Sequence, residues 1–178
     1  MGVSLGVPFA GLRRGAVTVS GRIEDPAEVL GPLPGDMSGL EVDLEVRGSA
    51  RDGVRVTGRL RGAVRSECRR CLEPLEILVE ARLDAWFRPA PEVTPGEDGV
   101  WPFEADAAEV DLTPAIREEV WLAVPEYPVC DDTCAGLCPR CGADLGEEEC
   151  ACPEPEPDPR WAALRGLEKG AAPPEDAR

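Results

Sequence analysis

Cysteine is the residue type in this sequence whose number and spacing indicate chemistry most clearly. The chain of 178 residues contains eight cysteines, and six of them lie in the 23 residues from 130 to 152. Cys138-Pro-Arg-Cys141-Gly is typical of the tight turn in which backbone amides stabilise two thiolates bound to one zinc ion. Because zinc prefers four ligands at tetrahedral corners, we expect Cys150 and Cys152 to fold back and complete the site.

The other cysteines leave alternatives open. Cys130 and Cys134 compete with Cys150 and Cys152 as the second pair of ligands. Eight thiolates would also suffice for two complete sites, and the second would then contain Cys68, Cys71, Cys130 and Cys134. Ordinary buried thiols without a metal are the simplest competing interpretation, and a redox pair at Cys150 and Cys152 is another.

The ligand types argue against catalysis. Catalytic zinc sites keep one position open for water and usually include histidine or a carboxylate, whereas four thiolates close the shell. The chain has no histidine, the commonest general base, so a hydrolase is not expected. A thiol oxidoreductase using Cys68 and Cys71 is the least favoured interpretation. We predict a structural zinc that orders an acidic, glycine-rich segment, and no small-molecule substrate.

The net charge of −16 is distributed unevenly along the chain. Residues 1–91 carry 13 acidic and 13 basic side chains and are neutral, whereas residues 92–158 carry 19 acidic side chains against Arg117 and Arg140. The excess acidity therefore lies beside the main cysteine cluster. Complementary charge steers association, so this half of the chain favours a basic protein as its partner.

The sequence also indicates a compartment. No stretch has the length of apolar residues that a membrane span needs, and residues 1–10 lack the features of a signal peptide. Closely spaced cysteine pairs in the reducing cytosol indicate metal ligation rather than disulfides. We therefore expect a cytoplasmic protein with no membrane association.

Three segments alternate apolar and polar residues with the period of two that is typical of strands with one buried face. They cover residues 41–47, 54–65 and 75–87, and the turn Gly48–Gly53 joins the first two. Residues 16–23 alternate more weakly and are expected to form an edge strand. The pattern predicts an antiparallel sheet, either a meander or a partly closed barrel.

One main helix is expected near residues 114–124. Thr113 is its predicted N-cap, Pro114 occupies the first helical position, and Pro125 ends the pattern. Its apolar face consists of Leu112, Ile116, Val120 and Val124. Residues 89–105 are expected to form a loop that Trp101 and Phe103 attach to the core. Together with the sheet, these elements predict an α+β fold with a C-terminal zinc knuckle.

Three regions follow from these patterns. Residues 1–128 are predicted to form the β-rich domain, and residues 129–152 the cysteine-rich knuckle. Residues 153–178 contain a proline-rich linker and a short helical tail. In that tail, Trp161 and Leu164 have helical spacing and are candidate anchors for a partner.

An arginine-rich strand face is the feature that suggests nucleic acid. If Val46 pairs with Val54, then Glu45 lies opposite Arg55 and Glu41 lies opposite Arg59, which neutralises much of this charge. The arginines expected to be free for phosphate contacts are Arg61, Arg65, Arg69 and Arg70.

Several motifs together resemble the YceD family, the large ribosomal RNA subunit accumulation proteins of bacteria and plastids. They are ECRRCLEPLE (67–76), VDLTPAIREEVWLAVPEYPVC (110–130), DTCAGLCPRCGADLGEEECAC (132–152) and DPRWAAL (158–164). The sequence looks like a cysteine-rich member of the family, since other members lack much of the C-terminal cluster. Cys68 and Cys71 match a pair that is more general in it.

The resemblance implies a non-catalytic role in the synthesis, processing or stability of 23S ribosomal RNA, and hence in large-subunit assembly. The expected partners are ribosomal proteins, the precursor of the large subunit or rRNA-processing factors, which the acidic half would bind. Direct binding of ribosomal RNA through the arginine face is the alternative.

Overall fold

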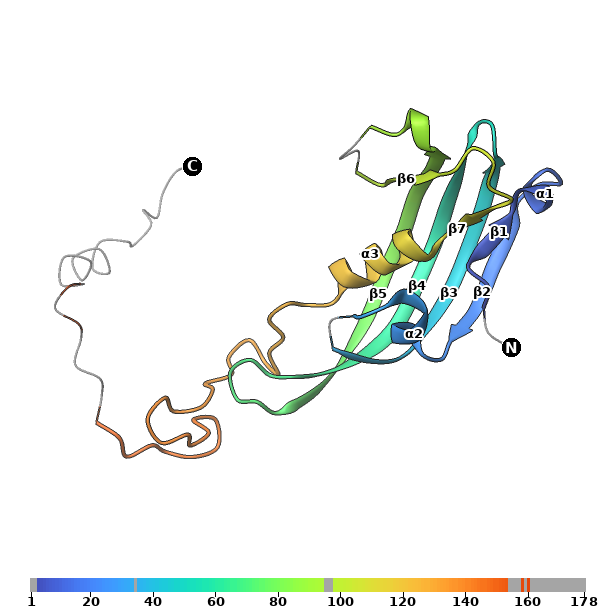
Figure 1. The fold of residues 1–178 in the computed structure, drawn as a ribbon. Coiled ribbons are helices and arrows are strands. Elements are labelled where there is room, and N and C mark those ends of the chain that lie inside the picture. Colours follow the sequence, from blue (N-terminus) through green and yellow to red (C-terminus); the bar gives the residue numbers. More distant parts are fainter. Residues whose placement is uncertain (1–2, 34, 95–97, 154–157, 159, 161–178) are drawn as a thin grey trace, which may run out of the picture. The chain divides into compact units, whose positions relative to one another are not determined.

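The structure, a computed structural model, describes residues 3–33, 35–94, 98–153, 158 and 160 (Figure 1). The chain divides into two compact units, residues 1–136 and 137–178. Residues 129–136, which we grouped with the cysteine-rich knuckle, therefore belong to the first unit. Trp161 and Leu164, the predicted anchors, lie outside the described residues.

A five-stranded sheet forms the first unit, with the strand order β2-β3-β4-β5-β6. The first four strands are an antiparallel meander of β2 (Val17–Ile23), β3 (Asp36–Ser49), β4 (Gly53–Glu67) and β5 (Pro74–Pro89), as the alternating patterns predicted. β6 (Val100–Phe103) is added in parallel to β5. β2 and β6 are the edge strands and do not pair with each other among the described residues, so the sheet has the meander form of the two that were expected.

The short elements were not expected from the sequence. A two-stranded ribbon pairs β1 (Gly6–Pro8) with β7 (Glu109–Asp111), and α1 (Phe9–Leu12), α2 (Pro26–Leu30) and the 3-10 turn η1 (Ala90–Glu92) connect strands. Each spans at most five residues, too few to show periodicity. The loop expected at residues 89–105 therefore contains both η1 and β6.

The main helix, α3 (Thr113–Ala123), packs against β5 on the face of the sheet that also contacts α1 and α2 (Figure 1). Its apolar face is as predicted, with Leu112, Ile116 and Val120 fully buried. Thr113 is not the N-cap. Leu112 is the N-cap residue and provides no side-chain cap, because Thr113 is already the first helical residue; the Thr113 amide donates to Asp111 Oδ1 at 2.9 Å.

One face of the sheet is apolar and the other is charged. Inward side chains from β3, β4 and β5 form the core with α3 and the N-terminal elements, and Phe103 is buried against it with Trp101 partly buried. This confirms the predicted attachment of that segment to the core. No helix in the described part of the chain is long and apolar enough to span a membrane.

Candidate metal centres

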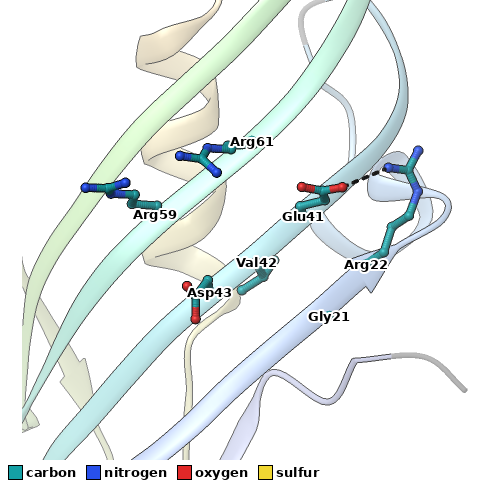
Figure 2. Close-up of a pocket in the computed structure, with 7 residues that line it drawn as sticks. All are labelled: Gly21, Arg22, Glu41, Val42, Asp43, Arg59 and Arg61. Carbon is teal, nitrogen blue, oxygen red and sulfur yellow. Dashed lines mark ion pairs between the residues drawn. The ribbon is translucent and has the colours of Figure 1, made fainter.

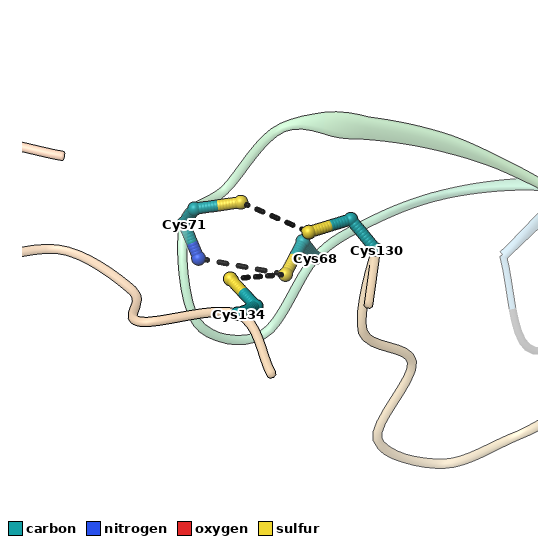
Figure 3. Close-up of side chains that lie close together, drawn as sticks. All are labelled: Cys68, Cys71, Cys130 and Cys134. Carbon is teal, nitrogen blue, oxygen red and sulfur yellow. Dashed lines mark hydrogen bonds between the residues drawn. The ribbon is translucent and has the colours of Figure 1, made fainter. Parts of the chain in front are cut away.

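Four cysteines meet where the turn between β4 and β5 approaches the segment that follows α3 (Figure 3). This first site contains Cys68, Cys71, Cys130 and Cys134, with all four sulfur atoms within 4.8 Å of one another. Cys68 and Cys71 are buried, Cys134 is half-buried and Cys130 is exposed. The two pairs come from positions more than 50 residues apart and converge only in the folded sheet.

The second site lies in the second unit. It contains Cys138, Cys141, Cys150 and Cys152, and its four sulfur atoms also lie within 4.8 Å of one another. Cys138 is buried, Cys141 is exposed and the other two are half-buried. The four residues that we predicted as ligands are thus brought together, whereas the alternates Cys130 and Cys134 join the first site.

The two Cys-X-X-Cys turns have the same backbone geometry. In the second site, the Cys138 amide donates to the Ala143 carbonyl at 2.7 Å, and the Gly142 amide donates to the Cys138 carbonyl at 2.9 Å. The first site repeats this pattern, with Cys68 N to Glu73 O at 2.8 Å and Leu72 N to Cys68 O at 2.9 Å. Both turns therefore present their sulfur atoms in the same way.

The sulfur spacing fits a tetrahedral metal. Zinc–thiolate bonds of about 2.3 Å place the four sulfur atoms of a regular tetrahedron about 3.8 Å apart, whereas a disulfide needs about 2.04 Å. In the first site, the Cys68–Cys134 and Cys71–Cys130 sulfur distances are 3.9 and 3.7 Å. In the second, Cys141–Cys150 is 3.5 Å and Cys138–Cys150 is 3.3 Å. Both donor sets suit a thiophilic divalent ion such as zinc.

Backbone amides prepare one thiolate in each site. The Cys71 amide is the main cause that lowers the pKa of Cys68 to about 6, and the Cys141 amide does the same for Cys138, whose pKa is also about 6. Neighbouring thiols, first Cys134 and then Cys71, raise the pKa of Cys130 to about 12. Full ionisation of such a cluster requires a cation to neutralise it, and a bound metal ion supplies that charge.

Cys152 has the corresponding raised pKa in the second site. Its value is about 12, and hydrogen bonding to Cys150 is the largest cause, followed by Cys141. The Cys152 amide in turn donates to the Cys150 sulfur at 3.3 Å. Each site thus combines one thiol whose pKa is lowered to about 6 with one whose pKa is raised to about 12, Cys130 in the first site and Cys152 in the second.

All four arginines that we expected to be free have partners. Arg61 pairs with Glu80 at 3.1 Å and Arg65 with Asp36 at 3.7 Å. Arg69 lies 4.9 Å from the Tyr127 ring centroid, and Arg70 Nη1 donates to the carbonyls of Asp132 and Cys134 at 2.9 Å each. The expectation of guanidinium groups without acidic partners was therefore wrong for Arg61 and Arg65, whereas Arg69 and Arg70 have no ion-pair partner among the described residues.

The pairing register explains part of this difference. Val46 pairs with Val56 and not with Val54, so Glu41 lies opposite Arg61, and Arg59 lies between Asp43 and Arg82. Arg59 has no ion-pair partner among the described residues. A β-bulge between Met37 and Leu40, near the start of β3, shifts the register by one residue, and Gly39 within it has a φ of 146°.

A hollow of about 450 Å³ lies on the charged side of the sheet near Arg59 (Figure 2). Arg22, Glu41, Asp43 and Arg61 line it with both signs of charge, and Arg22 pairs with Glu41 at 3.8 Å. Arg59 also lines the hollow, so its lining carries three arginines against two carboxylates.

Sequence reasoning missed the residues that support the first site. Tyr127 and Pro128 contact Arg69, and Arg70 donates to two carbonyls of the segment that follows α3, so these residues hold the two segments together. Leu72 has the left-handed backbone that Gly142 has in the second turn, with φ values of 64° and 76°. An alignment of the two Cys-X-X-Cys turns could have identified Leu72 from the sequence, because it places Leu72 at the position of Gly142.

Residues 56–168 match the family model described as large ribosomal RNA subunit accumulation protein YceD. The chain belongs to the YceD family. Similar proteins include an uncharacterized protein of Mycobacterium tuberculosis, 38% identical over 128 residues, which are 70% of this chain and 60% of the relative. One of Mycobacterium leprae is 34% identical over 131 residues, 72% of this chain and 58% of the relative. The YceD-family chain thus spans about 60% of the length of these relatives.

A plant protein also matches this YceD-family chain. It is the large ribosomal RNA subunit accumulation protein YCED homolog 1, chloroplastic, of Arabidopsis thaliana, 34% identical over 65 residues. The matched part is 36% of this chain and 20% of the plant protein. No solved structure matches the chain.

Proposed function

We propose that this chain is a non-catalytic factor that supports the synthesis, processing or stability of 23S ribosomal RNA, and so the assembly of the large ribosomal subunit in the cytoplasm. The observation that carries the proposal is the match of residues 56–168 to a family named for accumulation of that RNA. The thiolate-only donor sets are consistent with it, because they leave no open metal position for a substrate.

The second site is the proposed zinc centre of a partner-binding lobe. Zinc bound by Cys138, Cys141, Cys150 and Cys152 would order a segment that has little apolar surface to bury. Glu147, Glu148 and Glu149 lie within this segment, are exposed, and have no ion-pair partner among the described residues. A ribosomal protein, a precursor particle or a processing factor with a basic surface would suit them.

A pull-down of the tagged full chain tests this partner. At moderate salt we expect recovery of ribosomal proteins, large-subunit precursors or processing factors, and we expect the triple variant Glu147→Lys, Glu148→Lys, Glu149→Lys to lose most of it. Glu28→Lys, Glu92→Lys, Glu104→Lys is the matched control, since it changes three exposed acids elsewhere. Absence of all these companions, or equal loss in both variants, would contradict the proposed partner.

The cellular role has its own test. Depletion of the protein should lower the ratio of 23S to 16S ribosomal RNA, and the wild-type gene should restore it. An unchanged ratio on depletion would exclude a function in large-subunit RNA accumulation.

Direct contact with ribosomal RNA is a second candidate function. Arg59 and Arg82 are cross-strand neighbours on the charged side of the sheet, and neither has an ion-pair partner among the residues described. If they contact phosphates, Arg59→Glu with Arg82→Glu should weaken RNA binding and reduce its salt dependence. Arg13→Glu with Arg14→Glu is the matched control on exposed residues. Unchanged binding in the sheet variant would exclude this contact.

A further inference from the structure

We propose that the first site binds a second zinc ion, which clamps the turn between β4 and β5 to the segment that follows α3. Its ligands are Cys68, Cys71, Cys130 and Cys134. The inference goes beyond the function proposed above, because it concerns the architecture of the first unit and holds whichever partner the second unit binds.

The sulfur atoms are already at metal-binding distances. Cys68 pairs with Cys134 and Cys71 with Cys130, at 3.9 and 3.7 Å, close to the edge of about 3.8 Å in a zinc–thiolate tetrahedron. Two amides, of Arg70 and Cys71, point at the Cys68 sulfur from 3.4 and 3.5 Å (Figure 3 shows the second). Such N–H groups stabilise a thiolate, and this is the ligand form that zinc requires.

The backbone of the turn is held in a conformation that its sequence disfavours. Leu72 has a φ of 64°, at the position where the second site has Gly142. A leucine in the left-handed region costs about 1–2 kcal/mol, and its side chain is 58% exposed, so local packing returns little. A metal that needs both sulfur atoms of the turn gives a physical reason for this backbone.

Contacts around the site join the two segments independently of sulfur. The Arg69 amide donates to the Pro128 carbonyl at 2.9 Å, and the Arg70 side chain donates to two carbonyls of the segment that follows α3. Gly136 lies so close that a Cβ there would stand 3.0 Å from the Arg70 carbonyl oxygen. The ligand pairs are therefore positioned by the fold, and a metal ion would complete the junction instead of gathering free loops.

The two sites differ in what they connect. Cys68 and Cys134 are 66 positions apart, whereas Cys138 and Cys150 are separated by 12. Two cysteines of the first site are buried, against one in the second. A metal ion in the first site thus joins two segments that are distant in sequence, and it should exchange more slowly with a chelator than an ion in the second.

Metal stoichiometry of the full chain tests the proposal. We expect two zinc ions per wild-type chain, one in Cys130→Ser with Cys134→Ser, and one in the matched control Cys150→Ser with Cys152→Ser. Cobalt substitution of the control should give the spectrum of tetrahedral thiolate ligation from the first site alone. A wild-type chain with one metal ion that survives the Cys130 and Cys134 changes would overturn metal binding at the first site.

Thiol alkylation of the wild-type protein keeps the test valid if a variant fails to fold. With zinc present, Cys68 and Cys71 should be protected in the folded chain and should react once a strong chelator has removed both ions. Equal reactivity with and without zinc would contradict metal ligation, as would a mass lower by the hydrogens lost in disulfide formation. If the protein carries two zinc ions but recovers no partner in the pull-down, the proposed partner is refuted and this inference stands.

Discussion

Among the described non-glycine residues, Leu72 alone has a positive φ. Its side chain is 58% exposed, so it contributes little to the core. A substitution of Leu72 therefore tests the backbone conformation of the turn with little change in side-chain packing.

Leu72→Gly should stabilise the zinc-loaded protein. Relief of about 1–2 kcal/mol of left-handed strain outweighs the roughly 0.5–1 kcal/mol that glycine costs through freedom in the unfolded chain. The expected net gain is about 0.5–1 kcal/mol in urea unfolding. Gly142→Ala, the reverse change in the second turn, should weaken metal binding there, and a destabilised Leu72→Gly variant would contradict the assigned strain.

Arg55 and Asp84 form the best aligned ion pair of the charged face, with hydrogen bonds of 2.9 and 2.8 Å. Hydrogen bonding to Arg55 lowers the pKa of Asp84 below its usual 3.8. Since the folded pKa is the lower one, the pair stabilises the fold above the unfolded pKa, and this contribution disappears as pH falls through the folded pKa.

A carboxyl titration by NMR checks this pair. Arg55→Gln should raise the pKa of Asp84 toward its ordinary value, whereas Arg61→Gln should leave it unchanged because Arg61 pairs with Glu80. Equal effects of the two changes would show that the summed electrostatic field of the charged face sets the pKa of Asp84, and not its two hydrogen bonds with Arg55.

The long strands and α3 were predictable because their patterns extend over many residues. Val54, Val56, Leu60 and Val64 on β4 face inward as the alternation required. The register was not predictable, because a shift by two residues keeps every side chain on its own face. The turn decides it, with Ser49 Oγ accepting from the Arg51 and Asp52 amides and Ser49 pairing with Gly53.

The core face of α3 should dominate its stability. Ile116 is fully buried, and Ile116→Ala should lower the free energy of unfolding by about 2–5 kcal/mol through lost burial and a cavity. Leu122 on the same helix is 74% exposed, so Leu122→Ala should change it by less than about 0.5 kcal/mol. Urea denaturation measures both, and similar losses would mean that α3 packs by another face.

At the scale of the whole molecule, the two units are stabilised by different means. The core cluster lies within the first unit, whereas Cys138 is the one buried side chain among the described residues of the second. The sequence allowed prediction of the second site because its ligands are close in sequence. It left the first open, because a sheet had to bring Cys68 near Cys134.

Removal of metal should therefore affect the units unequally. In excess chelator, amides of residues 138–152 should lose all protection from hydrogen exchange, while the paired amides of β3 and β4 stay protected. Exchange measured by mass spectrometry, with and without added zinc, gives both results in one experiment. Protection of residues 138–152 in metal-free protein would contradict a metal-dependent lobe.

The separation of 66 positions between Cys68 and Cys134 also sets an order of events during translation. At about 5–20 residues per second, several seconds pass between the emergence of the first ligand pair and the second. Throughout that interval, the nascent hairpin of β4 and β5 exposes two unpaired thiols at its tip. The local ligands of the other site follow within seconds of one another, so the newly made chain reaches its most oxidation-sensitive stage before either ion can bind four sulfur atoms.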